Sequence, residues 1–319
     1  MYETLHKINT SFSPSVPGLQ IAWDSTSLGL LKRCPRLYQY SMLDGWISKD
    51  AAIPLHFGIL YHKGLERYDR LRADGADLDE ALREAIRHVL VDSGQRDASG
   101  KWIPWKPDDT YRNIPNLIRA IVWYVDSHQE DRVSTIQLSN GRAAVELSFK
   151  LAIPLENPDG GTYVLCGHMD RLVQFGESIY VLDYKTTKLT PNSYYFEKYN
   201  PDNQMSLYTL AANVVLQEPA AGIILDVAQL QVGGTKFERG IVSRTKGQID
   251  EWLSDTIVWI KKAEHHAEKG HWEMNDTSCD KYGGCPFRHV CASDPKVRET
   301  YLKSDFIKRV WDPLVERGD

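Results

Sequence analysis

Residues 166–188 read CGHMDRLVQFGESIYVLDYKTTK, two runs rich in strand-forming residues that are joined by a Phe-Gly turn. The alternation of apolar and polar residues predicts two antiparallel strands, at residues 167–175 and 178–186. Asp170 and Asp183 then fall at roughly opposite positions of the hairpin. Two like charges that face each other across a ladder are destabilising unless a positive group lies between them. A hard divalent cation with oxygen ligands, Mg²⁺ or Mn²⁺, is the obvious candidate.

Lys185 is expected to share a strand face with Asp183, because side chains along a strand alternate with period two. An ammonium group beside a metal-held water can position that water and stabilise charge on a phosphate, so the set suits metal-assisted phosphodiester hydrolysis. An isolated Asp-x-Lys is more often a solvated surface pair. Here the apolar residues 179–182 indicate a central strand, and open α/β sheets place their sites at the ends of such strands.

The composition is that of an ordinary globular protein, with 42% hydrophobic and 25% charged residues in 319, enough to bury a substantial core. The longest apolar runs fall far short of a membrane span, so we expect no membrane partner. The N-terminus has no basic-then-apolar signal pattern, which favours a cytoplasmic protein. A net charge of −5 gives no support for nucleic-acid binding over the whole surface, but it is compatible with a local basic groove.

Apolar and aromatic residues recur at helical spacing in residues 55–73, which puts His62 and Glu66 on one helix face at positions i and i+4. The spacing changes to strand-like alternation in the middle of the chain and becomes helical again in residues 202–217 and 245–270. Helices, then strands, then helix–strand–helix predict an α/β fold with an added helical lobe.

We therefore expect a single domain over residues 1–319. Its parts are an N-terminal helical part at 25–135, a core at 140–240, and a C-terminal helix and cysteine region at 241–319. Within the core, Glu146 in VELSFKL is expected to be an exposed strand residue unless its side chain points at the carboxylate site.

Three stretches resemble the RecB-like branch of the PD-(D/E)xK nuclease superfamily: GHMDRLV (167–173), VLDYKTT (181–187) and NQMSLYTLAA (203–212). Members of that branch typically show G-x-x-D-R, a D-Y-K-T strand, and Q-x-x-x-Y on the next helix. FGILYHKGLE (57–66) is similar to the family's helical G-x-x-x-H-x-x-x-E segment. The resemblance implies a restriction-endonuclease-like core, a mixed central sheet flanked by helices.

The resemblance also implies roles for individual residues, although His62 alone would more often be an ordinary core or surface histidine. It implies a Mg²⁺ or Mn²⁺ site with side-chain ligands from Asp170, Asp183 and His62 and with the Tyr184 carbonyl as a further ligand. It implies a catalytic lysine at Lys185, groups near the DNA at Gln204 and Tyr208, and a possible supporting role for Glu66.

Three of the five cysteines, Cys279, Cys285 and Cys291, form a C-x5-C-x5-C run. In a chain expected to be cytoplasmic, clustered cysteines favour a metal site over disulfides. Three thiolates leave a soft-metal site one ligand short, and Cys34 could complete it. Cys166 lies inside a predicted strand and is most simply a small buried core residue.

The segments LLKRCPRLYQY (30–40) and CPFRHVC (285–291) resemble the cysteine segments of iron–sulfur RecB-like nucleases such as AddB and the CRISPR-associated adaptation nucleases. In those relatives a 4Fe–4S cluster ties the two ends of the chain together. The resemblance implies such a cluster on Cys34, Cys279, Cys285 and Cys291. One departure is the first spacing of the C-terminal run, five residues where these relatives commonly have two. The alternatives are a structural zinc on four cysteines and unligated cysteines.

The resemblance implies a Mg²⁺- or Mn²⁺-dependent deoxyribonuclease, an exonuclease on single-stranded or end-containing DNA. It would act in recombination, repair or phage DNA processing in a bacterial, archaeal or phage-infected cell. The chain contains no Walker A motif, so a helicase or recombination partner would be a separate protein. The alternatives are a zinc-stabilised nuclease and a catalytically silent DNA-binding or assembly subunit. The intact Asp and Asp-x-Lys set speaks against a silent subunit, because a retired site has no reason to keep mutually repelling carboxylates.

Overall fold

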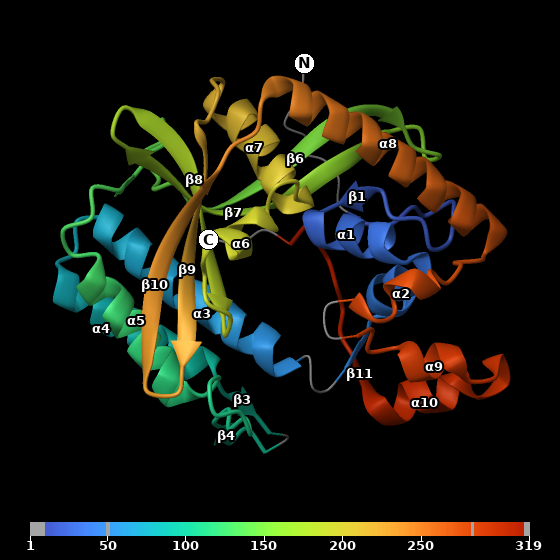
Figure 1. Ribbon diagram of the computed structural model, residues 1–319, viewed down its shortest axis with the longest axis horizontal. Coiled ribbons are helices and arrows are strands. Elements are labelled where there is room, and N and C mark those ends of the chain that lie inside the picture. The colour runs from blue at the N-terminus through green and yellow to red at the C-terminus, as the bar shows by residue number, and fades with distance from the viewer. Residues whose placement is uncertain (1–9, 49–51, 98, 282–283, 316–319) are drawn as a thin grey trace.

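The computed structural model describes residues 10–48, 52–97, 99–281 and 284–315, and its centre is a seven-stranded sheet (Figure 1). The main path of the sheet runs β1-β7-β8-β9-β10, and β5 and β6 also pair with β7. The β1–β7 and β8–β9 pairs are parallel and the other pairs of this sheet are antiparallel, so the sheet is mixed. Its strands are β1 (Ala22–Trp23), β5 (Ser134–Thr135), β6 (Val145–Glu156), β7 (Thr162–Phe175), β8 (Ser178–Thr187), β9 (Gly222–Gln231) and β10 (Gly234–Val242).

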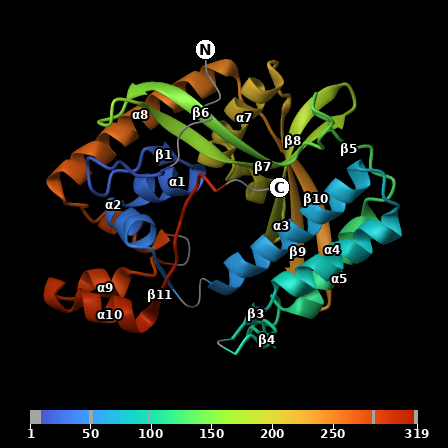
Figure 2. The same cartoon turned by 180° about the vertical axis from the view of Figure 1, so that it is seen from behind.

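Helices cover both faces of this sheet, as the two opposite views show (Figures 1 and 2). One core contains buried residues of α1, α7 and α8, which pack against β6, β7 and β9. The other contains buried residues of α3, α4 and α5, which pack against β8 and β9. These helices are α1 (Ser25–Arg33), α3 (Ala52–Ala73), α4 (Leu78–Asp92), α5 (Ile114–Ser127), α7 (Asn203–Leu216) and α8 (Lys246–Lys269).

Local sequence explains where the long helix α8 begins and ends. The Thr245 side chain accepts a hydrogen bond from the backbone N–H of Gln248, and the Gln248 side chain accepts one from the backbone N–H of Thr245. This reciprocal cap satisfies donors that a helix start otherwise leaves unpaired. Gly270 follows the helix in the left-handed conformation, with φ 60°, which glycine adopts without steric cost.

The two ends of the chain meet beside the main sheet. β2 (Trp46–Ser48) pairs antiparallel with β11 (Phe306–Lys308), and a small apolar cluster joins Leu37 and Tyr40 to Phe287 and Leu302. Figures 1 and 2 show α2 on the same side of the molecule as α9 and α10. The remaining elements are α2 (Pro35–Tyr38), η1 (Gln39–Leu43), β3 (Gln95–Arg96), β4 (Trp102–Ile103), α6 (Ser193–Glu197), η2 (Asp276–Ser278), α9 (Arg288–Ala292), η4 (Pro295–Val297) and α10 (Arg298–Asp305).

The predicted fold class, a mixed central sheet flanked by helices, is confirmed. The strands β1, β5 and β10 were not predicted, because two of them have only two residues each and β10 carries little alternation. The predicted single domain at 1–319 stays a prediction, and its residues 1–9, 49–51, 98, 282–283 and 316–319 lie outside the described chain.

Candidate active site

The β7 and β8 strands separate at the two predicted carboxylates. Their ladder runs from Phe175↔Ser178 to Arg171↔Leu182 and stops there. Continued by one step, the same register would place Asp170 opposite Asp183. Instead, β8 goes on paired only with β9, while β7 goes on paired with β6 and, farther from the turn, with β1. The sheet therefore forks at these two residues. A fork leaves room for side chains between two strands that would otherwise be hydrogen-bonded.

Asp170 is held by contacts from both sides of the fork. Its Oδ2 accepts a hydrogen bond of 2.8 Å from the backbone N–H of Tyr184 and lies 3.3 Å from His62 Nδ1. The His62 side chain comes from α3, which covers the sheet at this point. The structure therefore brings His62 to the first carboxylate, and the metal-ligand role that the resemblance implies for His62 stays a prediction.

Asp183, Lys185 and Gln204 form a closed triangle. Lys185 Nζ lies 2.5 Å from Asp183 Oδ2 and donates a hydrogen bond of 3.0 Å to Gln204 Oε1. Gln204 Nε2 donates to Asp183 Oδ1 at 3.2 Å. Asp183 and Lys185 thus share a strand face, as period-two alternation requires, and α7 supplies the third member. The Asp183 side chain is 1% exposed.

A cavity of about 840 Å³ opens onto the fork. Predicted site residues in its wall are His62, Glu66, Asp170, Asp183, Gln204 and Tyr208. Lys185 reaches the site through its contacts with Asp183 and Gln204. Glu66 also pairs with Arg70, whose Nε lies 3.1 Å from Glu66 Oε1. The cavity is large enough for a nucleotide-sized group at the carboxylates.

Glu146 differs from the expectation of an exposed strand residue, since it is 6% exposed and lines the same cavity. Its φ is +50°, in the left-handed region, and β6 pairs with β7 on either side of it at Val145↔Arg171 and Leu147↔Met169. Simple alternation fails at such an irregular position, and the carboxylate turns inward. The signal that could have found it is its place opposite Asp170 in the sheet, which the sequence alone does not give.

The environment sets the two aspartates apart in acidity. Burial raises the pKa of Asp170, but His62, Lys185 and the Tyr184 N–H outweigh burial and hold it below its usual value. Burial and repulsion from Asp170 raise the pKa of Asp183 to about 6, against the attraction of Lys185. Burial lowers the pKa of Lys185, and the two aspartates more than reverse this, so the ammonium form is favoured.

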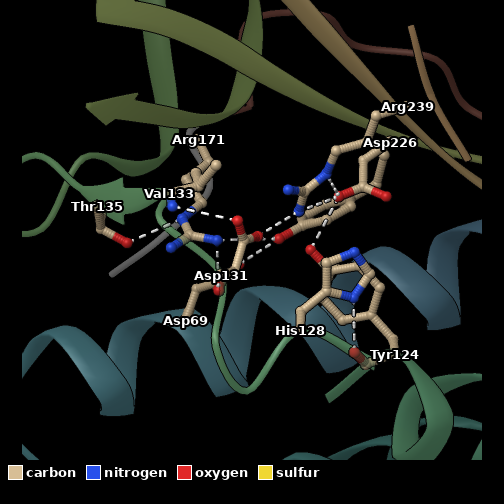
Figure 3. A network of polar contacts seen from close by, with 10 residues as sticks. Asp69, Tyr124, His128, Asp131, Val133, Thr135, Arg171, Asp226 and Arg239 are labelled. Atoms are coloured by element: carbon tan, nitrogen blue, oxygen red, sulfur yellow. Dashed lines mark hydrogen bonds and ion pairs between the residues drawn. The ribbon is translucent and has the colours of Figure 1, made fainter. Parts of the chain in front are cut away.

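A buried polar network lies behind the fork (Figure 3). Arg171 Nη1 lies 3.0 Å from Asp69 Oδ1, and the Tyr184 hydroxyl donates to Asp69 Oδ2 at 2.7 Å. Arg171 and Tyr184 are the chain neighbours of the two aspartates. Their side chains therefore anchor the backbone that presents Asp170 and Asp183. None of these contacts was predicted from the sequence, because Asp69 lies far away along the chain.

Whether the site fits the expected divalent metal depends on its donors. Among the described residues, no group of three or more His, Cys, Asp or Glu side chains is arranged to hold a metal ion. The positive charge beside the carboxylates is the Lys185 ammonium, with His62 against Asp170. The donors themselves, two carboxylates and an imidazole around one cavity, have the chemistry that suits Mg²⁺ or Mn²⁺. The ligand role predicted for the Tyr184 carbonyl stays a prediction.

The predicted cysteine ligands come from both ends of the chain. Cys34 lies between α1 and α2, where its sulfur accepts a hydrogen bond of 3.3 Å from the backbone N–H of Asn275. Cys34, Cys285 and Cys291 pack against the apolar cluster of α2 and α10, and all five cysteines are free. Within the described part of the chain, the four predicted ligands are not arranged as a group that could hold a metal ion, so the cluster stays a prediction. Burial raises the pKa of the Cys285 thiol, and nearby Cys279 and Cys34 raise it further. Cys166 is 1% exposed, as expected for a core residue.

Comparison with known proteins agrees with this geometry. A family described as the PD-(D/E)XK nuclease superfamily matches residues 23–292, which span every residue of the fork and its cavity named above. The chain belongs to the PD-(D/E)XK nuclease superfamily. No curated protein matches the chain.

Two solved structures show only distant similarity to this nuclease. The protein SSO0001 is 15% identical, over 75% of this chain and 76% of the other, with a TM-score of 0.28. A protein named "Putative exonuclease", from Eubacterium rectale, is 9% identical over 86% of this chain and 94% of the other, with a TM-score of 0.39. At these values neither bears on the chemistry of the site. No helix in the described part of the chain is long and apolar enough to cross a membrane.

Proposed function

We propose that this superfamily member is a Mg²⁺- or Mn²⁺-dependent deoxyribonuclease that hydrolyses phosphodiesters in single-stranded or end-containing DNA. The observation that carries the proposal is the fork, where Asp170, Asp183 and Lys185 meet beside one cavity. Burial and a second carboxylate raise the pKa of Asp183 to about 6, so keeping this carboxylate ionised costs free energy. A site without activity would not need a group with that cost. This argues for a working site over the alternative of a silent DNA-binding or assembly subunit.

Each residue of the fork has a definite task in this proposal. Asp170 and Asp183 would hold the metal, with His62 as a further donor. When bound there, the metal supplies Lewis-acid activation of a water molecule and of the phosphoryl oxygens. The Lys185 ammonium, which donates to Gln204 at 3.0 Å and lies 2.5 Å from Asp183, would stabilise negative charge that develops on the phosphate. Tyr208 and Gln204 form the wall from α7 against which the DNA backbone would lie.

Cleavage of end-labelled single-stranded and duplex DNA tests this function. The full chain is incubated with Mn²⁺ or with chelator and is compared with Lys185→Ala and Lys246→Ala. Lys246 is the matched control because its side chain is 88% exposed on α8. We expect metal-dependent cleavage that Lys185→Ala lowers by about a hundredfold and Lys246→Ala leaves unchanged. Cleavage that survives chelation, or that Lys185→Ala leaves intact, would exclude the proposed mechanism.

We also propose that Cys34, Cys279, Cys285 and Cys291 hold a 4Fe–4S cluster. The proposal is supported by the packing of Cys34, Cys285 and Cys291 around one apolar cluster, which brings cysteines far apart in the sequence to the same part of the molecule. A cluster there would close a very long loop and contribute directly to folding. Analysis of iron, sulfide and zinc in the purified protein separates this from the zinc alternative.

We further propose that the nuclease acts in DNA recombination, DNA repair or phage DNA processing. Recombination, repair or phage DNA processing each supplies free or single-stranded ends, and a separate helicase or recombination protein would deliver them. A pull-down with DNA present and absent would test for such a partner.

A further inference from the structure

The segment after β11 returns from the cysteine region to the nuclease core. Residues 309–315 run from the β2–β11 pair back to β1 and β7, and both views show this segment passing toward the centre of the molecule (Figures 1 and 2). Ser11 donates a hydrogen bond of 2.5 Å to Asp312 Oδ1. Leu314 is buried in a cluster with Ala22 and Val164. The segment is therefore docked on the core at its far end.

The near end of the segment is fixed as well. The backbone N–H of Arg309 donates a hydrogen bond of 2.8 Å to the Gly45 carbonyl. A Cβ at Gly45 would lie 2.6 Å from the Arg309 carbonyl oxygen, and the φ of Gly45 is +70°. Only glycine allows this close approach in this conformation. The segment is therefore held by specific contacts at both of its ends.

Between these two anchors, Trp311 forms part of the wall of the active-site cavity. Trp311 is half-buried, and the Arg309 guanidinium lies over one face of its ring, 5.5 Å from the centroid. Its indole N–H is buried and donates no hydrogen bond to the residues that the structure describes. Pro54 and Leu55 of α3 line the same cavity, and Leu55 is 39% exposed. Aromatic and aliphatic side chains in the wall of a carboxylate site suit a planar apolar group with polar edges, such as a nucleobase.

Arg67 supplies a cation on the same cavity wall. Other basic residues of the wall are already paired, since Lys63 Nζ lies 2.5 Å from Asp92 Oδ2 and Arg70 contacts Glu66. Arg67 is exposed and has no hydrogen bond or ion pair with the residues that the structure describes. Its guanidinium is therefore available to a phosphate, which it can contact with two N–H groups at once.

We propose that Trp311 and Arg67 both contact one single-stranded stretch of the DNA as it passes Asp170 and Asp183 through the cavity that all four residues line. One base stacks on the face of the Trp311 indole that Arg309 leaves free, and a phosphate farther along the strand contacts Arg67. This rests on the proposed nuclease function and adds the residues that select a single strand. A base in a duplex is already stacked and paired, so it cannot lie on the indole without leaving the helix. A single strand or a frayed end offers its bases freely, in any sequence.

Equilibrium binding in chelator tests this without any cleavage. Fluorescence anisotropy of a labelled single-stranded oligonucleotide and of a labelled blunt duplex is measured with the full chain. The variants are Trp311→Ala, Trp311→Phe and the control Trp123→Ala, whose ring on α5 is 41% exposed and lies outside the cavity. We expect Trp311→Ala to weaken single-strand binding about tenfold or more, because stacking on an aromatic side chain contributes that much per base. Trp311→Phe keeps most of the affinity, Trp123→Ala all of it, and duplex binding does not change.

The salt dependence of single-strand binding tests the Arg67 contact. Arg67→Ala should lower the slope of log affinity against log salt concentration by about 0.7, the contribution of one phosphate contact on a single strand. Arg87→Ala is the matched control, since that side chain on α4 is 74% exposed. An unchanged slope in Arg67→Ala would exclude the phosphate contact.

Three results would overturn the Trp311 assignment. Unchanged single-strand binding by Trp311→Ala would show that the ring carries no base. Tighter binding would show that the segment blocks the cavity, and equal losses for single strand and duplex would show a general effect on the protein. If the wild-type chain cleaves DNA and any of these results is found, the Trp311 assignment is wrong and the proposed nuclease function stands. If single-strand binding depends on Trp311 but the chain shows no Mn²⁺-dependent cleavage, the proposed nuclease function is wrong and the Trp311 contact stands.

Discussion

The backbone N–H of Tyr184 donates a 2.8 Å hydrogen bond to the side chain of Asp170, at the point where the ladder between their two strands ends. One strand therefore carries Asp183 and at the same time holds the carboxylate of the other strand in place. This contact lies just beyond the last ladder pair and ties the Asp170 carboxylate to the backbone next to Asp183. A small movement of either strand at the fork would change the geometry of both candidate metal ligands.

The network behind the fork should determine much of the stability of the protein. Arg171→Ala leaves the Asp69 carboxylate, which is 2% exposed, without its cation. Breaking a buried ion pair in this way costs about 3–5 kcal/mol, so we expect a loss of that size in the free energy of unfolding. Urea denaturation measures it, with Lys246→Ala as the control, because its exposed pair with Asp250 contributes little. A loss in Arg171→Ala no larger than in this control would contradict the role of the network.

The affinity for Mn²⁺ should fall in acid. Burial and Asp170 raise the pKa of Asp183 to about 6 in the metal-free protein. Metal binds the ionised carboxylate, so below this pKa it must displace a proton, and the affinity then falls about tenfold per pH unit. Calorimetric titration with Mn²⁺ from about pH 7.5 to about pH 5 measures this. An affinity that stays constant over that range would mean that Asp183 is not a ligand.

Two substitutions of Glu146 separate the effect of its backbone strain on stability from the effect of its carboxylate on cleavage. Its φ of +50° lies in the left-handed region, which glycine adopts without steric cost and which alanine and glutamate disfavour. Glu146→Gly should therefore be more stable than Glu146→Ala by about 1 kcal/mol in thermal or urea unfolding. Both variants remove a carboxylate from the cavity wall and should lower Mn²⁺-dependent cleavage alike. Full activity in both would show that the inward carboxylate has no part in the reaction.

The cysteine proposal makes a prediction about colour and stability. Cys34→Ser should abolish absorbance at about 400 nm and lower the melting temperature, because the cluster would lose the ligand that joins the two ends of the chain. Cys166→Ala is the matched control, since Cys166 is buried in a different cluster. A colourless wild-type protein with bound zinc would favour the zinc alternative.

The sequence predicted the fork residues because their pattern is local. Period-two alternation is enough to put Asp183 and Lys185 on one face, and the short turn is enough to align Asp170 with them. Gln204 and His62 followed only through the family resemblance, because nothing in a helix periodicity says which strand the helix will meet. The structure supplies that information through the packing of α7 and α3 on the sheet.

Other parts of the site depend on long-range geometry and could not be predicted. The inward turn of Glu146 follows from one left-handed residue, which breaks the alternation that sequence patterns assume. The contact between Arg171 and Asp69 joins β7 to α3 across many intervening residues. Trp311 reaches the cavity because the β2–β11 pair fixes one end of its segment and the contacts of Asp312 and Leu314 fix the other. Each of these features depends on a tertiary contact, and such contacts produce no periodic pattern in the sequence.

The most direct test of the central claim is the rate of Mn²⁺-dependent cleavage of end-labelled single-stranded DNA by the wild-type chain and by Asp183→Asn. The substitution keeps the size of the side chain and removes the charge that would hold the metal. The account predicts cleavage by the wild type that chelator abolishes, and a loss of about a hundredfold or more in Asp183→Asn. Equal rates for the two proteins, or no cleavage by the iron-replete wild type with Mn²⁺ or Mg²⁺, would contradict it.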